Sequence, residues 1–154
     1  MSLEQDVRIL SQVPIFSQLE GEALRLLAFT AEKIQCLKDE ALFRSGEPSD
    51  CAYLLISGKV RLENAPGDPM ASTIAEANFL IGETALVADT RRPCTATAIE
   101  DCHAFRIPRP LFLRIMREFP GGAVKVRAFM ASRLREFVSE IDAARCRADS
   151  LAAQ

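Results

Sequence analysis

The stretch that decides the fold runs from Phe79 to Ala98 and reads Phe-Leu-Ile-Gly-Glu-Thr-Ala-Leu-Val-Ala-Asp-Thr-Arg-Arg-Pro-Cys-Thr-Ala-Thr-Ala. An apolar run ends at Gly82, and the carboxylate of Glu83 follows directly, before a short helix-prone piece. A polar turn then presents two arginines, and Thr95 begins a run that alternates like a strand. This stretch therefore predicts a strand, one helical turn, an arginine and a second strand.

That arrangement suits a small phosphate group. Gly82 lets backbone approach a ligand because it has no Cβ, and the free N–H groups of a helical start at Glu83 to Ala85 favour an anion. Arg92 can give two parallel N–H bonds to phosphate oxygens. Glu83 only accepts hydrogen bonds when ionised, so a ribose hydroxyl suits it. The alternative interpretation is that Arg92 pairs with Glu83 and simply closes a loop.

The same residues resemble the phosphate-binding cassette of the cyclic nucleotide-binding domain family. The family pattern is Gly-Glu-x-Ala-Leu, followed a few residues later by Pro-Arg-x-Ala-Thr. The matching positions here are Gly82, Glu83, Ala85, Leu86, Arg92 and Thr95. The resemblance implies that Glu83 binds the ribose 2′-hydroxyl and that Arg92 binds the cyclic phosphate. The ligand-binding set that it implies is Gly82, Glu83, Thr84, Ala85, Arg92, Pro93, Cys94 and Thr95.

Two positions depart from the family pattern. Arg91 stands where proline is usual, and Pro93 stands where other members offer a backbone N–H or a hydroxyl to the phosphate. Proline has no N–H to donate, and losing one charge-assisted hydrogen bond costs about 1.5–3 kcal/mol. The departure at Pro93 therefore predicts weakened binding, above all of cGMP, for which that hydroxyl often helps in relatives.

Length and composition argue against several classes of function. The chain has 154 residues, which suits one domain, and its 49% hydrophobic content is ordinary for a globular protein. A net charge of −2 argues against a nucleic-acid binder, which usually carries a basic face. The single histidine, His103, excludes jelly-roll metal enzymes that need several imidazole ligands. No apolar run reaches the roughly 20 residues of a membrane span.

The cysteines are odd in number and scattered, and none forms a Cys-x-x-Cys pair. The N-terminal residues are polar and charged, without the apolar region of a signal peptide. Together these features predict reduced thiols and a cytoplasmic location. The five cysteines are Cys36, Cys51, Cys94, Cys102 and Cys146.

Periodicity divides the chain into three parts. Residues 3–13 and 20–31 predict two amphipathic helices, and many short strands with frequent turns follow. The piece Tyr53 to Val60 is a second match to the family, in which Gly58 makes a tight hairpin. The resemblance implies an α+β domain, an eight-stranded antiparallel jelly-roll β-barrel flanked by N-terminal and two C-terminal helices. The predicted single domain covers residues 1–154, with N-terminal helices in 1–31, the barrel in 32–108 and C-terminal helices in 109–154.

The C-terminal part predicts two helices. The first begins at Pro108-Arg109-Pro110, and Pro120-Gly121-Gly122 ends it as a candidate hinge. The second runs from about Ala123 to about Leu151. Its apolar residues recur at alternating spacings of four and three, which is a heptad seam. The seam residues are Met130, Leu134, Phe137, Ile141, Ala144, Ala148 and Leu151.

The seam allows two interpretations. It favours a homodimer through this helix, as in family members of the catabolite-activator type, or it only covers the mouth of the barrel. The arginines of this helix are predicted to be solvated. They are Arg127, Arg133 and Arg135.

The leading hypothesis is a non-enzymatic cyclic nucleotide sensor, for cAMP, in which phosphate binding draws the last helix towards the site. The alternative is a degenerate fold that acts as a dimerisation or protein-interaction scaffold. An enzyme is disfavoured because no nucleophile stands beside a base in a motif. The chain ends at Gln154 without a helix-turn-helix, so no direct DNA binding is expected, and any protein partner stays unknown. No cofactor other than the nucleotide ligand is predicted.

Overall fold

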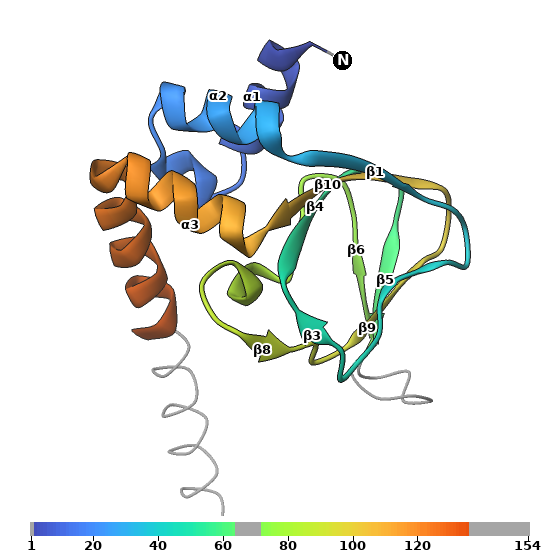
Figure 1. Cartoon of the computed structure of the whole chain (residues 1–154). Helices are drawn as coiled ribbons and strands as arrows, with labels where there is room; N and C mark the ends of the chain where they lie inside the picture. The colour runs from blue at the N-terminus through green and yellow to red at the C-terminus, as the bar shows by residue number, and fades with distance from the viewer. Residues whose placement is uncertain (1, 64–71, 136–154) are drawn as a thin grey trace, which may run out of the picture.

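The computed structural model describes residues 2–63 and 72–135, and its helices gather on one side of the strands (Figure 1). In α1, the Ser2 hydroxyl caps the first turn by accepting the backbone N–H of Gln5. The helices are α1 (Leu3–Ser11), α2 (Gly21–Thr30), α3 (Arg109–Glu118) and a further helix over residues 120–135, with short 3₁₀ helices η1 (Phe16–Gln18) and η3 (Glu83–Leu86).

The strands pair antiparallel throughout, in three sheets. The first sheet has the order β1 (Glu32–Cys36), β10 (Cys102–Pro108), β4 (Cys51–Ser57) and β7 (Leu80–Ile81). The second has the order β2 (Ala41–Phe43), β9 (Thr95–Ala98), β5 (Val60–Glu63) and β6 (Ser72–Ala75). The third is a ribbon of β3 (Pro48–Ser49) and β8 (Thr90–Arg91).

These pairings confirm the predicted α+β class with antiparallel sheets. Among the described strands no pairing joins the sheets into one closed sheet, so the eight-stranded barrel stays a prediction. One cluster of buried side chains nevertheless draws members from both four-stranded sheets, including Tyr53 and Leu55 of β4 and Ala96 and Ala98 of β9. The two four-stranded sheets therefore share a core.

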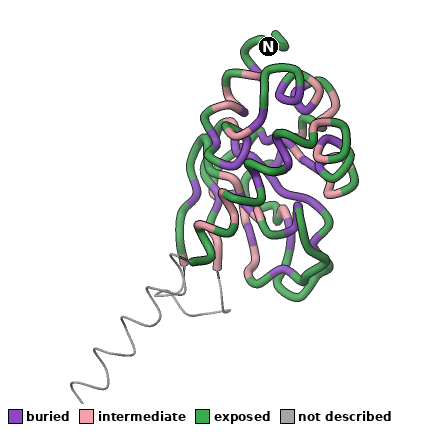
Figure 2. Tube along the Cα trace, turned by 90° about the vertical axis from the view of Figure 1, so that its left-hand side faces the viewer, coloured by how far each residue is buried: buried purple, intermediate pink, exposed green. Residues whose placement is uncertain are grey.

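A second core joins the helices to the first sheet. Ala52 and Leu54 of β4 pack with Phe105 and Ile107 of β10 against buried residues of α1, α2 and α3. Buried positions accordingly occur in both the helical and the sheet halves of the molecule (Figure 2). Strand β4 lies between the two cores, which explains its unbroken apolar run, since a strand buried on both faces does not alternate.

The turn after β4 differs from the predicted hairpin. Gly58 has a φ of 91°, and a Cβ there would lie 2.6 Å from the Asp101 carbonyl oxygen, so glycine is required as predicted. However, β4 pairs with β10 and β7, whereas β5 pairs with β6 and β9. The turn therefore carries the chain from one sheet to another and does not close a two-stranded ladder.

The break between the last two helices is shorter than predicted. Helix α3 ends at Glu118, and only Phe119 is non-helical, with φ −126° and ψ 72°. The next helix begins at residue 120, because a proline in a first turn has no N–H bond to lose. Gly122 lies inside that helix, where a Cβ would come within 3.0 Å of the Leu19 side chain.

Part of the predicted heptad seam lies outside the described residues. Met130 and Leu134 are described, and Leu134 is 63% exposed. The remaining seam positions fall beyond the described ranges. Within residues 2–63 and 72–135, no helix has the length and apolarity that crossing a membrane requires.

Candidate functional site

The cassette begins where β7 ends at Gly82. Gly82 has φ 79° and ψ 38°, a left-handed conformation, and η3 follows directly. Ala85 and Leu86 of η3 are buried and anchor this turn to the core, whereas Thr84 is exposed. The helical turn predicted for this stretch is thus a 3₁₀ turn of four residues, Glu83–Leu86.

Gly82 lies against the side chain of Arg92. A Cβ at Gly82 would come within 2.6 Å of the Arg92 Nη1 atom, closer than any real Cβ contact. Glycine is therefore needed here for two reasons, its positive φ and the close approach of a guanidinium group. The sequence places these two residues ten positions apart, and the fold brings them into contact.

Loop contacts fix the backbone of Arg92. Its N–H donates to the Glu47 carbonyl at 2.8 Å, and its carbonyl accepts from the Gly46 N–H at 2.9 Å. Strands β3 and β8 pair just beside it, with Pro48 opposite Arg91. These hydrogen bonds therefore fix the position of the cassette relative to the loop before β3.

The guanidinium of Arg92 is buried, with only 4% of the residue exposed. Its Nη2 donates to the Cys51 carbonyl at 2.7 Å and lies 3.3 Å from the Cys51 Sγ. The group stacks over the Phe43 ring at 4.2 Å and lies 5.8 Å from the Tyr53 ring centroid. These contacts orient the cation without neutralising it.

Two donor atoms of this guanidinium, Nε and Nη1, are buried and have no hydrogen-bond partner among the described residues. Arg92 also forms no ion pair within that part of the chain. A buried charge without a counter-ion is costly, and buried polar groups are normally satisfied. Unpartnered donors on a fixed, buried arginine are what an anion-binding site requires.

Glu83 does not pair with Arg92, so the loop-closing alternative is not formed. Its Oε2 instead accepts a hydrogen bond from Nη1 of Arg133, in the helix over residues 120–135. Its Oε1 is buried without a partner among the described residues. Arg133 is exposed, as predicted, but its head group also lies on a cassette carboxylate, a contact that the sequence did not indicate.

The remaining predicted site residues differ in their exposure and in their hydrogen bonds. Pro93 is exposed, and Cys94 is half-buried. Burial raises the pKa of the Cys94 thiol, although the Arg92 charge works in the opposite direction. The Thr95 hydroxyl already accepts the backbone N–H of Ser45 at 3.0 Å, so part of its hydrogen-bonding capacity is structural.

Arg109 is a residue near the site that the sequence reading missed. Its side chain lies at the start of α3 and ties this helix to the cassette loop, with an ion pair to Asp89 at 3.8 Å. In the sequence, Pro-Arg-Pro only signals a helix start. Arg109 Nη1 donates to the carbonyls of Ser49, Ala85 and Ala88 at 2.9, 3.3 and 2.7 Å.

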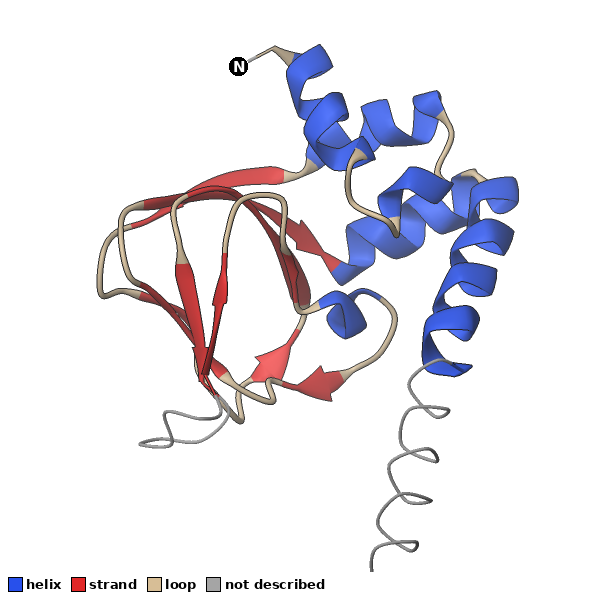
Figure 3. Ribbon diagram, turned by 180° about the vertical axis from the view of Figure 1, so that it is seen from behind, coloured by secondary structure: helices blue, strands red, loops and turns tan. Residues whose placement is uncertain are grey.

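A hollow of about 420 Å³ lies between η3 and the helix over residues 120–135. Figures 1 and 3 show η3 between the sheets and this helix. The volume falls within the range of about 300–1,000 Å³ that small-molecule sites take. The lining residues are Glu83, Thr84, Met130, Ala131, Arg133 and Leu134.

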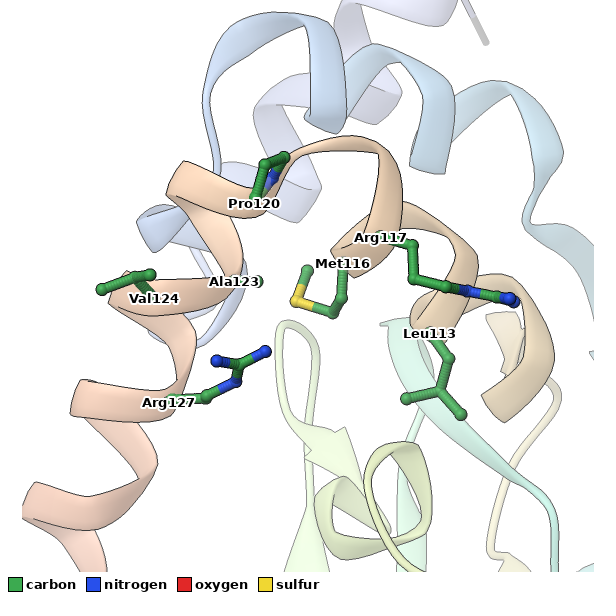
Figure 4. Close-up of a pocket in the computed structure, with 7 residues that line it drawn as sticks. All are labelled: Leu113, Met116, Arg117, Pro120, Ala123, Val124 and Arg127. Atoms are coloured by element: carbon green, nitrogen blue, oxygen red, sulfur yellow. The ribbon is translucent and has the colours of Figure 1, made fainter.

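Another hollow, of about 670 Å³, lies away from the cassette, between α3 and the same helix (Figure 4). Met116 and Arg127 point towards one another across it, and Leu113 projects from α3 (Figure 4). It contains none of the predicted site residues. No cluster of three potential metal ligands occurs in the described ranges, and His103 is exposed on β10.

Comparisons with known proteins agree on one family. The profile of the cyclic nucleotide-binding domain matches residues 33–119. A solved cyclic nucleotide-binding-like protein from Brucella abortus is 34% identical, with a TM-score of 0.65 over 73% of this chain and 98% of that one. The regulatory domain of Toxoplasma gondii PKA, solved with cAMP, shares the fold at 24% identity and a TM-score of 0.67, covering 73% and 44% of the two chains.

Among curated proteins, lysophospholipase nte1 of Aspergillus fumigatus is 31% identical over 113 residues, which is 71% of this chain but 7% of the relative. The chain thus spans less than a tenth of the length of such relatives. The family match covers more than half of the chain and includes most of β1, the whole cassette from Gly82 to Thr95, and α3. This chain therefore belongs to the cyclic nucleotide-binding domain family.

Proposed function

We propose that this domain is a non-enzymatic sensor that binds a cyclic nucleotide, cAMP, with the cyclic phosphate on Arg92. The observation that carries the proposal is the buried guanidinium of Arg92 with two unpartnered donor atoms beside Gly82. A phosphate would satisfy both donors and neutralise the charge. The same fold is found with cAMP in the regulatory domain of Toxoplasma gondii PKA.

The proposed ligand-binding residues have distinct roles. Gly82 leaves the space that a Cβ would fill, Arg92 pairs with the phosphate, and Glu83 accepts the ribose 2′-hydroxyl. The apolar hollow between η3 and the helix over residues 120–135 receives the base, against Met130 and Leu134. The other proposed members of the set surround the phosphate, and they are Thr84, Ala85, Pro93, Cys94 and Thr95.

Signal transmission is proposed to use the helix over residues 120–135. This helix contacts the cassette through Arg133 and joins α3 through the single non-helical residue Phe119. If the ligand binds more tightly when this helix is in one of two positions, binding shifts the population of molecules towards that position. We propose that residues 1–154 act as one unit in this way, with helices in 1–31 and 109–154 around a barrel in 32–108.

We also propose that this domain acts in the cytoplasm. The described cysteines are free thiols, which suits the reducing cytoplasm. The lysophospholipase activity named in the relatives belongs to proteins of which the match covers only 7%, so we do not transfer it. Neither direct DNA binding nor a membrane contact is part of the proposed function.

Calorimetric titration with cAMP and cGMP tests the proposal. Wild-type protein is expected to bind cAMP, and Arg92→Ala is expected to abolish the binding heat. Arg92→Lys, which keeps the charge but loses the paired donors, should bind more weakly than wild type. The matched control is Arg91→Ala, because Arg91 is exposed and its side chain donates, among the described residues, to the Gly46 carbonyl alone. A folded wild-type protein that gives no heat at millimolar cAMP would overturn the proposal.

A second candidate function is a homodimerisation scaffold. Leu134 is 63% exposed on the described part of the last helix, and it occupies a seam position of the heptad spacing. A second copy would cover it through the same seam. Sedimentation of wild type and Leu134→Asp distinguishes the cases, with Leu113→Asp on α3 as the control. A monomeric wild type at high micromolar concentration excludes this candidate.

A further inference from the structure

The last two described helices are basic, although the chain as a whole is acidic. Residues 109–135 hold seven basic residues and one acid, Glu118, whereas the whole chain carries a net charge of −2. Three of the basic side chains form ion pairs inside the domain, and they are Arg109, Arg114 and Arg133. The others form no ion pair within the described part of the chain, so their charge stays available to a partner.

Two of these unpaired arginines, Arg117 and Arg127, lie at one hollow. The α3 hollow, of about 670 Å³, lies between α3 and the helix over residues 120–135, with its lining residues drawn in Figure 4. Leu113, which is 41% exposed, and Val124, which is 62% exposed, also line it. No carboxylate is among the lining residues, so an apolar centre lies within a purely basic rim.

This combination favours an acidic amphipathic helix. Leu113 and Val124 project from two different helices, and a groove between helices binds a third helix through apolar side chains at i, i+3 and i+4. Carboxylates on the flanks of such a helix would meet Arg117 and Arg127, since complementary charges fix the register of an interface. The two helices that form the α3 hollow offer no strand edge to which an extended peptide could add.

Two other anionic partners fit the α3 hollow poorly. A nucleic acid would bring phosphates to the arginines, but it would leave Leu113 and Val124 without an apolar partner. An anionic membrane is flat, and it cannot reach the floor of the hollow, where Ala123 is only 3% exposed. A protruding apolar side chain on a partner helix reaches that floor and covers the apolar rim as well.

We propose that the α3 hollow docks an acidic amphipathic helix of a partner protein. An apolar side chain of that helix lies between Leu113 and Val124, and its carboxylates pair with Arg117 and Arg127. The inference goes beyond the proposed nucleotide sensing and does not depend on it, because none of the proposed nucleotide-binding residues lines this hollow.

A peptide selection tests the proposal. The probe is a phage-displayed library of helical peptides with leucine fixed at i, i+3, i+4 and i+7 and random residues elsewhere. It is selected on the wild-type chain and counter-selected on Val124→Asp, a change at an exposed position that should leave the fold intact. The selected peptides are expected to be rich in Asp and Glu. Finding no peptide that depends on Val124, or only peptides no more acidic than the starting library, overturns the proposal.

Charge reversal tests the rim. A selected peptide is labelled with fluorescein, and its affinity is measured by fluorescence anisotropy. Arg127→Glu is expected to weaken binding by about tenfold, because a repulsive charge replaces an attractive one. The matched control is Lys125→Glu, which makes the same charge change on the same helix outside the α3 hollow and should weaken binding by less than about twofold. Equal losses would mean general attraction to a basic surface and would overturn the docking site.

Three further probes separate this site from other functions. Wild type and both charge variants are tested with phosphatidylserine vesicles and with a DNA oligonucleotide. Binding of either one that is lost in Arg127→Glu but kept in Lys125→Glu assigns the α3 hollow to a membrane or a nucleic acid and overturns the proposal. Calorimetry with cAMP should give the same Kd for wild type and Arg127→Glu, since Arg127 does not line the hollow beside Glu83. A wild type that binds the acidic peptide but no cAMP overturns the proposed function alone.

Discussion

Gly82 and Gly46 share a backbone conformation but not their surroundings. Both have positive φ, 79° and 87°, yet a Cβ at Gly46 would meet nothing within 4 Å, whereas one at Gly82 would meet Arg92 Nη1 at 2.6 Å. An L-residue in the left-handed region costs about 1–2 kcal/mol. We expect Gly46→Ala to lose about that much stability in urea unfolding, and Gly82→Ala to lose more. Equal losses would show that Arg92 moves aside freely.

Pro93 offers a residue-scale test of affinity. Its ring leaves no backbone N–H to donate to a phosphate, and the residue is exposed, so replacing it should not disturb packing. We expect Pro93→Ala to bind cAMP at least about tenfold more tightly, which is the low end of the about 1.5–3 kcal/mol that one charge-assisted hydrogen bond contributes. Calorimetry measures this, with Pro110→Ala in the first turn of α3 as a control. An unchanged Kd would mean that position 93 does not face the phosphate.

At the scale of residues, the sequence could predict those site residues that belong to one short motif. Gly82 and Arg92 follow from a short pattern, and their contact in the structure agrees with that pattern. The partners of Arg92 and Glu83 could not be predicted. Cys51 lies 41 residues before Arg92, and Arg133 lies 50 residues after Glu83. Such contacts depend on how β4 and the last helix pack, which periodicity alone does not specify.

The link between α3 and the cassette is the clearest contact at the scale of elements. Arg109 donates to three backbone carbonyls, of which one is in β3 and two lie in or just after η3. Hydrogen bonds from charged groups contribute about 1.5–3 kcal/mol each when buried, and those of Arg109 are only partly buried. We expect Arg109→Ala to lower the free energy of unfolding by about 2–3 kcal/mol and to speed hydrogen exchange in η3.

Arg117 provides the control for that prediction. It lies in the last turn of the same helix and forms no ion pair in the described ranges, so Arg117→Ala should change stability by less than about 0.5 kcal/mol. If Arg109→Ala and Arg117→Ala behave alike in urea unfolding, Arg109 does not tie the cassette to α3.

Element types were easier to predict than element partners. Helical periodicity predicted the helices near residues 3–13 and 20–31, observed as Leu3–Ser11 and Gly21–Thr30. The pairing of β4 was mispredicted because a glycine turn predicts a reversal without saying which sheet receives the chain. The start of the last helix was also mispredicted. Pro120 suggested a break, although a proline in a first turn is compatible with a helix.

At the scale of the whole molecule, stability rests on two cores that share β4. One core joins the helices to the first sheet, and the other joins the two four-stranded sheets. The phosphate-binding candidate Arg92 lies on the rings of Phe43 and Tyr53, which belong to the second core. The helix over residues 120–135 contributes Val126 to the first core. A change at the cassette can therefore reach the helical half across β4, through Leu86 of η3, through Arg109 of α3 or through the helix that carries Arg133.

The second core also makes the fold sensitive to alkaline pH. Burial, helped by the neighbouring Cys51 thiol, raises the pKa of Tyr53 from 10.0 to about 12, and burial raises the pKa of the Cys36 and Cys102 thiols from 9.0. The unfolded chain therefore loses these protons at lower pH than the folded one. Since it binds fewer protons, the free energy of unfolding falls as pH rises above about 9, and the tyrosine contribution is lost between pH 10 and about 12.

Urea midpoints measured from pH 8 to pH 11 should therefore decline in wild type. Tyr53→Phe keeps the ring that packs 6.0 Å from Phe43 but has no phenol to ionise, so its decline above pH 10 should be shallower. The difference between the two slopes isolates the tyrosine from the thiols and from every other group that titrates in this range. Parallel slopes would mean that the Tyr53 phenol ionises as easily in the folded protein as in the unfolded chain, and that the core around Arg92 is open to water.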